Sequence, residues 1–469
     1  MRYTSTRGEA PELGFTDALL AGLARDGGLY VPERYPTLTP AEIAGFAGQP
    51  YSEVARRVIT PFTGGELADA DLARMVDAAR RTFRHAAVTP LTQIDSNLFV
   101  LELFHGPTLA FKDVAMQLLG RLMDHALRQR GRRATIVGAT SGDTGAAAID
   151  AFRGSANVDV FILYPLGRVS DVQRRQMTTI DDANVHAIAV EGTFDDCQNI
   201  LKGLFNHHAF RDEIGLSGVN SINWARIVAQ VVYYFTAGVA LGAPHRPVSF
   251  TVPTGNFGDI LAGYIAKRMG LPVARLNIAT NSNDILARTL ATGAYEMRGV
   301  AATQSPSMDI QISSNFERLL FDFHDRDAAS IRALSDNLAQ ARRFDIAPRP
   351  LAKLRDEFSA GTADEAATTA EMARTWRDSG YMLDPHTAVG VAVARRALQK
   401  DPATPMVALG TAHPAKFPDA VRKAIGVTPQ LPLHLADIME RKEHFTVLAN
   451  DQRAVENFVR ARARITAKV

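Results

Sequence analysis

Short apolar runs alternate with helical patterns through most of the chain from about residue 97 onward. The apolar runs have the length of buried strands, and the segments after them repeat apolar residues at the spacing of one helix face. The predicted strands are 98–101, 134–137, 158–163, 185–190, 248–252, 273–279 and 406–409. The predicted helices are 113–130, 144–152, 172–180, 194–205, 260–269 and 418–424. This alternation predicts an α/β protein with parallel sheets that helices cover on both faces.

Two segments of the chain lack this alternation of strands and helices. Residues 1–90 have amphipathic helical patterns interrupted by prolines, and residues 322–380 have the pattern of charged helices in an outer layer. We therefore predict a mostly helical N-terminal domain over 1–90, an α/β domain over 91–240 and a second α/β domain over 241–469.

One segment is apolar enough to be tested as a membrane span. Ile227 to Pro244 carries no charge across 18 residues, close to the roughly 20 that a spanning helix needs. It also contains polar or small residues such as Gln230, Tyr233 and Gly238, which fit a fully buried helix better. We expect a core helix and no membrane partner.

Composition and charge limit the classes of molecule that the protein is expected to bind. Hydrophobic residues make up 46% and charged residues 22%, and the net charge of +2 comes without a basic block for nucleic acid. We expect a small-molecule substrate and no nucleic acid. Cys197 is the only cysteine, so no internal disulfide or thiolate metal cluster is expected; with no secretory signal at the N-terminus, a reducing cytoplasm is the expected compartment. The scattered histidines predict no metal site.

Lys112 stands directly after Leu109, Ala110 and Phe111 and before a predicted helix. Burial of an ammonium among apolar side chains lowers its pKa. A neutral amine is a nucleophile that forms Schiff bases with aldehydes. The alternative is a structural lysine whose stem packs at the helix start while its charge reaches solvent.

The stretch 254–258, Thr-Gly-Asn-Phe-Gly, lies between a predicted strand and a predicted helix. There, successive backbone N–H groups and a helix N-terminus can bind a phosphate. An ordinary tight turn is the alternative. The stretch lacks the Lys-Ser/Thr ending of a nucleotide P-loop, which disfavours ATP.

The stretch 138–145 also links a strand to a helix, and its hydroxyls and amides are suited to a carboxylate. Its glycines do not have the spacing of a dinucleotide-binding loop. Asp143 is a candidate helix cap in either case.

Gly410 to Lys416 follows the strand predicted at 406–409, at the end where open α/β sheets place ligands. The hydroxyl of Thr411 is suited to a heterocyclic nitrogen. His413 and Lys416 either reach the substrate or are loop residues, and the turn 383–387 is either site-lining or a helix start.

Together these features resemble the fold type II pyridoxal-phosphate enzymes, the tryptophan-synthase-β-like group, and within it the threonine synthases. The resemblance covers nearly the whole chain. It rests on seven stretches in this order: 3–8, 26–32, 105–113, 140–145, 223–226, 253–258 and 410–414.

The resemblance implies pyridoxal 5'-phosphate as cofactor, with Lys112 as its Schiff-base residue. The residues implied to bind the rest of the cofactor are Gly255, Asn256, Phe257 and Gly258 for its phosphate and Thr411 for its pyridine nitrogen. The residues implied to line the substrate site are Thr140, Ser141, Asp143 and Thr144. Related enzymes often have Asn in place of Asp143. A carboxylate would repel a substrate carboxylate, so we expect the loop amides and hydroxyls to bind the acid group.

The implied activity is that of a carbon–oxygen lyase that converts O-phospho-L-homoserine and water to L-threonine and phosphate, the last step of threonine biosynthesis. The Lys112 amine would serve as base. Lys416, Arg7 and Arg226 are candidates to hold the substrate phosphate, with plain surface charge as the alternative for each.

Two alternatives stay open. One is a threonine-synthase-like phospholyase that makes a 2-oxo acid from the same ester; the other is a non-catalytic relative that only binds an amino acid. No pattern in the sequence indicates an oligomeric state.

Overall fold

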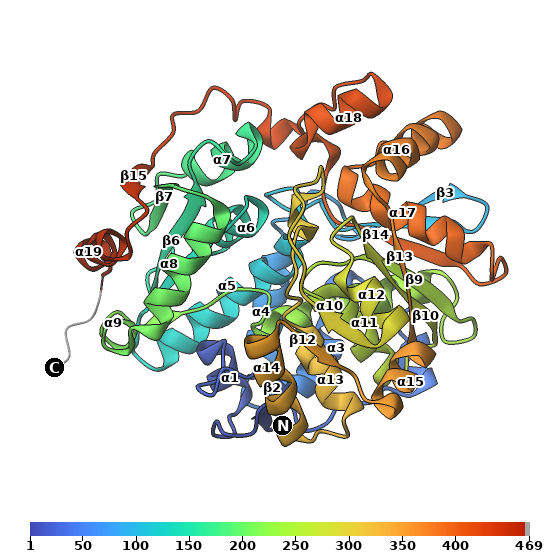
Figure 1. The fold of residues 1–469 in the computed structure, drawn as a ribbon, viewed down its shortest axis with the longest axis horizontal. Coiled ribbons are helices and arrows are strands. Elements are labelled where there is room, and N and C mark those ends of the chain that lie inside the picture. Colours follow the sequence, from blue (N-terminus) through green and yellow to red (C-terminus); the bar gives the residue numbers. More distant parts are fainter. Residues whose placement is uncertain (465–469) are drawn as a thin grey trace.

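Two sheets form the frame of the computed structural model, which describes residues 1–464 (Figure 1). The larger sheet has the strand order β13-β10-β9-β14-β4-β3. Its strands are β3 (Leu91–Asp95), β4 (Leu98–Glu102), β9 (Val248–Pro253), β10 (Val273–Thr280), β13 (Phe358–Thr362) and β14 (Met406–Gly410). Only the edge strand β3 is antiparallel to its neighbour. The prediction of parallel sheets in an α/β fold is confirmed.

The smaller sheet is parallel throughout, in the order β15-β7-β6-β5-β8. Its strands are β5 (Ala134–Ala139), β6 (Val158–Pro165), β7 (Val185–Glu191), β8 (Leu216–Ser217) and β15 (Thr446–Ala449). Two short antiparallel sheets complete the set, formed by β1 (Tyr3–Ser5) with β2 (Tyr30–Pro32) and by β11 (Ala294–Glu296) with β12 (Arg343–Asp345).

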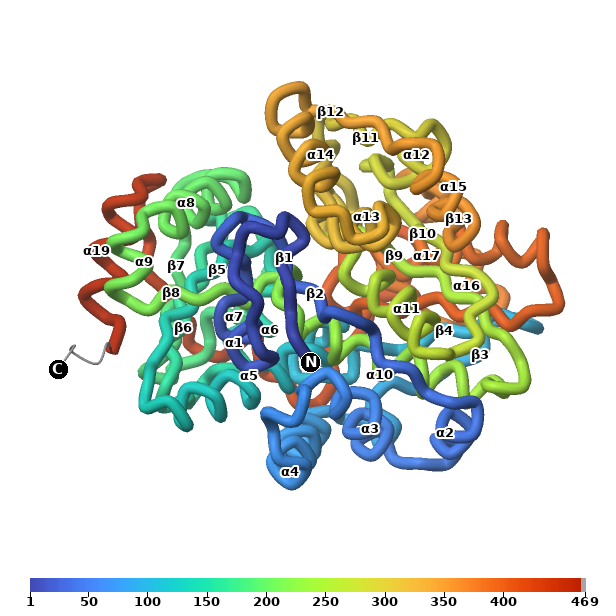
Figure 2. The backbone as a smooth tube through the Cα atoms, turned by 90° about the horizontal axis from the view of Figure 1, so that it is seen from below, coloured from blue at the N-terminus to red at the C-terminus, as the bar shows by residue number. Residues whose placement is uncertain are grey.

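Sheet membership does not follow the chain order. Strand β4 pairs with β14, with Leu98 opposite Met406, so a segment near residue 100 completes the larger sheet. Strand β15 pairs with β7, with Thr446 opposite Ile188, so the end of the chain returns to the smaller sheet. Figures 1 and 2 show this return, in red, beside the green and cyan elements. The division into domains at residues 90 and 240 stays a prediction, and both sheets draw strands from across the second boundary.

Helices cover both sheets and fill the space between them. Those of the first half are α1 (Phe15–Ala21), α2 (Pro40–Ala44), α3 (Tyr51–Thr63), α4 (Asp69–Arg80), α5 (Lys112–Gln129), α6 (Asp143–Phe152), α7 (Asp171–Thr178), α8 (Phe194–Asn206), α9 (His208–Glu213) and α10 (Trp224–Ala240). Those of the second half are α11 (Gly258–Arg268), α12 (Ile285–Thr292), α13 (Phe316–Phe323), α14 (Ala328–Ala341), α15 (Pro348–Glu357), α16 (Glu365–Ser379), α17 (Pro385–Leu398), α18 (Pro418–Ile425) and α19 (Gln452–Arg462). Three short 3₁₀ turns are η1 (Pro306–Met308), η2 (Pro414–Lys416) and η3 (Leu433–Leu435).

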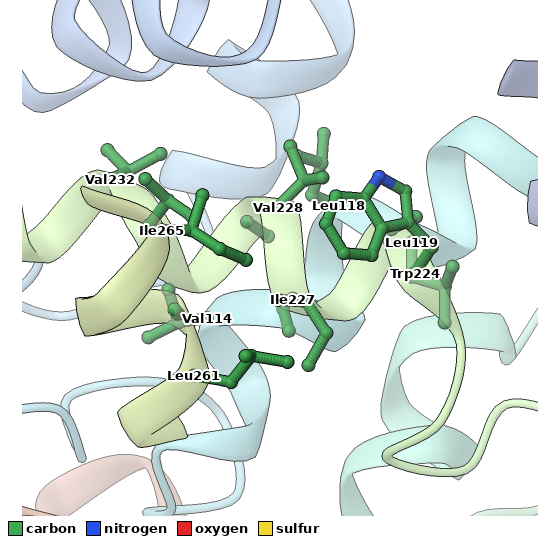
Figure 3. Packing of buried hydrophobic residues seen from close by; sticks show 14 of the residues in the cluster. Val114, Leu118, Leu119, Trp224, Ile227, Val228, Val232, Leu261 and Ile265 are labelled. Atoms are coloured by element: carbon green, nitrogen blue, oxygen red, sulfur yellow. The ribbon is translucent and has the colours of Figure 1, made fainter. Parts of the chain in front are cut away.

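Helix α10 lies at the centre of the core. Its apolar side chains, among them Trp224 and Ile227, pack against Val114 and Leu118 of α5 and against Leu261 of α11 (Figure 3). Within residues 1–464, no helix has the length and hydropathy of a membrane span. The expectation of a buried helix at this segment is therefore confirmed by its packing.

The segment 322–380 is less helical than expected. It contributes β12 and also β13, which pairs with β10 from Leu276 opposite Phe358 onward. The β13 sequence Phe-Ser-Ala-Gly-Thr has one large apolar residue, so it lacks the run by which the other strands are recognised. Strand β13 is therefore part of the sheet because its backbone pairs with β10, not because it has an apolar run.

A buried acid joins α10 to α11. Asp259 accepts hydrogen bonds from the hydroxyls of Tyr233 and, at 3.2 Å, of Tyr234, and its Oδ2 has no partner within the described residues. Burial raises the pKa of Asp259 to about 7. The folded state therefore holds a proton here that the unfolded chain, with an ordinary pKa of 3.8, releases at a lower pH.

Asp259→Asn should stabilise the protein most at high pH. A group with a raised folded pKa loses its stabilising contribution as the pH rises through that pKa, and an amide does not ionise. The stabilisation relative to wild type should grow by roughly 2 to 3 kcal/mol between pH 5 and pH 8, measured by urea unfolding. The exposed Asp336→Asn is the control, and a difference that stays constant with pH would contradict the assignment.

Candidate active site

Four loops converge at the carboxyl ends of strands from both sheets. They follow β4, β5, β9 and β14, and they carry residues 105–112, 140–143, 254–258 and 411–416. Parallel strands end at one edge of their sheet, where the helix N-termini that follow also point. This arrangement brings together residues that are far apart in the sequence.

Lys112 is the first residue of α5 and is buried. Its loop is held from two sides. The carboxylate of Asp113 accepts bonds from the N–H (2.8 Å) and hydroxyl (2.7 Å) of Thr108. Phe111 N–H donates to the carbonyl of Thr411 at 2.8 Å, so the loop after β14 is paired with the lysine loop.

Asp143 is the polar centre of the site. Its Oδ1 lies 2.8 Å from Nζ of Lys416 and accepts a bond from Nε2 of Gln173 at 2.9 Å. Its Oδ2 lies 3.3 Å from Nζ of Lys112 and 3.2 Å from Oγ of Ser307. The four partners come from η2, α7, α5 and η1, so one carboxylate ties four elements together. Both oxygens of Asp143 already contact donors of the protein, and the group is itself a carboxylate. Asp143 is therefore poorly suited to bind a substrate carboxylate.

Burial and neighbouring charges set the protonation of these groups. Burial lowers the pKa of Lys112, and the cations Lys416 and Arg226 lower it further against the opposing effect of Asp143. The two lysines hold the pKa of Asp143 well below its usual range despite burial. The amine of Lys112 is therefore easier to deprotonate than a solvent-exposed lysine, as expected for a nucleophile or base.

The stretch after β9 has the geometry of an anion site. Phe257 has a φ of +63°, and the N–H groups of residues 255–258 donate to no acceptor within residues 1–464. A Cβ added at Gly255 would lie 2.9 Å from the carbonyl oxygen of Ser307, so only glycine fits the close approach there. Consecutive free amides at the start of α11 form a site for a phosphate.

Thr411 presents a buried hydroxyl that has no partner in the described chain. Its N–H donates to the hydroxyl of Thr387 at 3.1 Å, and that hydroxyl is bonded to Asp384. Asp384 also accepts from Nδ1 of His386 at 2.9 Å, so Nε2 of His386 is free to accept from the N–H of Ser307 at 3.2 Å. The turn 383–387 is thus both a helix start and a support of the site.

The loop after β5, which carries several hydroxyl groups, is partly held by hydrogen bonds within itself. The Thr140 hydroxyl accepts from the N–H groups of Gly142 (2.9 Å) and Gly145 (3.0 Å), which rigidifies the turn. Ser141 and Thr144 are half-buried. Their role as substrate ligands stays a prediction.

Several supporting residues were not identified from the sequence. Gln173 and Ser307 reach the site through hydrogen bonds to Asp143 across 30 and 164 positions of the sequence. His413, by contrast, is mostly buried beside Phe104, and burial lowers its pKa to about 4. It is therefore a neutral loop residue at physiological pH.

The residues present fit pyridoxal phosphate. Its phosphate matches the unbonded amides of 255–258, its pyridine nitrogen the orphaned Thr411 hydroxyl, and its aldehyde the buried amine of Lys112. The amides and the Thr411 hydroxyl have no partner within residues 1–464, while the Lys112 amine is bonded to Asp143 alone.

Comparisons with known proteins agree with this geometry. Family models described as "Threonine synthase N terminus", "Pyridoxal-phosphate dependent enzyme" and "Threonine synthase, C-terminal" match residues 2–80, 82–411 and 387–459. A threonine synthase of Pseudomonas aeruginosa is 54% identical over 460 residues, which cover 98% of each chain.

Two solved structures have nearly the same fold. The chain aligns with pyridoxal-phosphate-bound threonine synthase from Brucella melitensis with a TM-score of 0.96 and 65% identity, over 99% of this chain and all of the other. It aligns with threonine synthase from yeast with a TM-score of 0.93 and 40% identity, over 98% of both chains.

Proposed function

Because this chain belongs to the threonine synthase family of pyridoxal-phosphate-dependent enzymes, we propose that its substrate is O-phospho-L-homoserine and that Lys112 carries the cofactor. The chain is a threonine synthase, a lyase of amino-acid biosynthesis that acts on a small molecule with pyridoxal 5'-phosphate. The observation that carries the residue assignment is the convergence of the buried Lys112 amine, the 255–258 amides and the Thr411 hydroxyl.

The bound cofactor supplies electron withdrawal that acidifies the substrate α-carbon. The protein's part is to hold and move protons. The Lys112 amine, with its lowered pKa, is placed to take a proton and return it. Asp143 lies 3.3 Å from that amine and provides a fixed negative charge for its protonated form.

Of the three cations considered for the substrate phosphate, Arg226 has the strongest support. Lys416 is neutralised by Asp143, and Arg7 lies 3.0 Å from Glu317. Arg226 is buried, donates to the carbonyl of Val219 at 3.2 Å and forms no ion pair with a carboxylate among residues 1–464. Burial without a counter-ion lowers the pKa of Arg226 to about 10. A buried cation of this kind is stabilised by an incoming anion.

The test is turnover of O-phospho-L-homoserine with product analysis. We expect L-threonine and phosphate from the wild type, and about a 100-fold lower kcat/KM for Arg226→Gln, since a charged buried hydrogen bond is lost. Arg7→Gln, whose charge is already paired, is the control and should change kcat/KM less than about threefold. A 2-oxo acid without threonine would assign the phospholyase activity instead, and equal losses in both variants would remove the Arg226 assignment.

A further inference from the structure

Residues 313–318 form hydrogen bonds to the backbone carbonyls of the candidate phosphate loop, residues 254–258. Oγ of Ser313 donates to the carbonyl of Gly255 at 2.6 Å. The backbone N–H and the side-chain Nδ2 of Asn315 both donate to the carbonyl of Asn256 at 3.0 Å. Two successive carbonyls of the loop therefore point toward residues 313–318 and accept hydrogen bonds from them.

Arg318 fixes which way the Asn315 amide points. Its fully buried guanidinium donates to Oδ1 of Asn315, to the carbonyl of Ile222 at 2.6 Å and to the carbonyl of Tyr30 at 3.0 Å. A guanidinium has donors only, so the Asn315 oxygen must face it and the NH₂ group must face the Asn256 carbonyl. The orientation is therefore determined by the protein before any ligand arrives.

Because each peptide is planar, fixing these carbonyls also fixes the direction of the N–H groups that follow them. In a planar trans peptide the C=O and the following N–H point in opposite directions. A Gly255 carbonyl bonded to Ser313 therefore turns the Asn256 N–H away from residues 313–318, and the Asn256 carbonyl does the same for the N–H of Phe257. These are two of the N–H groups that have no acceptor within residues 1–464.

We propose that Ser313, Asn315 and Arg318 are positioning residues for the cofactor phosphate: they hold the carbonyls of Gly255 and Asn256 so that the next two N–H groups are aimed at the anion. The inference rests on the proposed role of residues 255–258. Such fixed amides bind an anion without first reorganising, so the anchoring residues set the affinity for the phosphate rather than for the rest of the cofactor.

The test compares binding of pyridoxal phosphate with binding of pyridoxal, which lacks the phosphate. Apo-protein is titrated with each compound by absorbance. The variants are Ser313→Ala, Asn315→Ala, Gly255→Ala and the control Ser314→Ala. Ser314 is the matched neighbour, because its hydroxyl reaches the Asn256 side chain at 3.4 Å and no loop carbonyl. Thermal melting of each apo-variant shows whether it is folded.

We expect Ser313→Ala to raise the Kd for pyridoxal phosphate about fivefold to tenfold, the equivalent of one hydrogen bond, and to leave the Kd for pyridoxal within about twofold. Asn315→Ala should raise the first Kd further, and Ser314→Ala should change neither. An unchanged Ser313→Ala beside a weakened Gly255→Ala would overturn the anchoring and keep the loop as the phosphate site. Equal loss of both ligands in Ser313→Ala would also overturn it. Gly255→Ala binding as tightly as wild type would overturn the phosphate site itself.

Discussion

Lys112→Ala should lower turnover of O-phospho-L-homoserine by at least about 1000-fold, because the proposed base and the covalent anchor of the cofactor are lost together. Lys112 is buried, and burial beside Lys416 and Arg226 lowers its pKa. No solvent-exposed amine can replace a group in that position. The measurements are steady-state turnover and mass spectrometry of the protein after borohydride reduction.

Wild type should retain the cofactor covalently at Lys112 after reduction, and Lys112→Ala should retain none. Lys112→Arg separates charge from chemistry, since a guanidinium keeps the charge near Asp143 but forms no Schiff base. The exposed Lys400→Ala is the matched control and should behave as wild type. Full activity of Lys112→Ala, or reductive labelling at another lysine, would refute the assignment.

The second large effect concerns the buried pair of Asp143 and Lys416. Lys416 is fully buried, with Nζ 2.8 Å from Asp143 and 2.7 Å from the carbonyl of Thr108. Asp143→Asn or Lys416→Met alone should lower the free energy of unfolding by about 3 to 5 kcal/mol, because each leaves a buried charge without its main counter-ion. The double substitution should cost clearly less than the sum, since both charges then leave the interior.

Urea unfolding of the four apo-proteins gives the coupling energy, and the absorption spectrum of the holo-proteins reports on the surroundings of the cofactor. The pair Lys267–Glu357, 2.5 Å apart and partly exposed, serves as control: Lys267→Met, Glu357→Gln and their combination should couple by less than about 1 kcal/mol. Additive losses at Asp143 and Lys416 would show that the two groups do not compensate each other. In the double variant Lys112 lacks both neighbouring charges, even where stability is regained. The pH dependence of the absorption spectrum of its holo-protein should therefore be shifted from that of the wild type.

Regular strands and helices could be predicted from the sequence wherever apolar periodicity was strong. The seven predicted strands all occur, from β4 to β14, because most of their residues are buried and apolar. The four edge strands of the two main sheets, β3, β8, β13 and β15, escaped prediction. An edge strand pairs on one side only, and Val447 of β15 is 46% exposed, so backbone pairing rather than a buried apolar run defines such a strand.

The same distinction applies to the site. Lys112, the 254–258 stretch and Thr411 lie in glycine-rich or strand-end motifs that mark local geometry. Gln173, Ser307 and Asn315 have no such motif, and they reach the site through hydrogen bonds to residues distant in the sequence. A single sequence does not reveal which distant residue a side chain will meet.

The pairing of β4 with β14 has a consequence for synthesis of the chain. The loop that carries Lys112 is closed by the carbonyl of Thr411, and Lys416 follows five residues later. On the ribosome these partners emerge about 300 residues after the lysine loop. A nascent chain therefore exposes an unpaired edge of β4, close to the Lys112 loop, until β14 has been made, and a product truncated before residue 411 cannot assemble the proposed site.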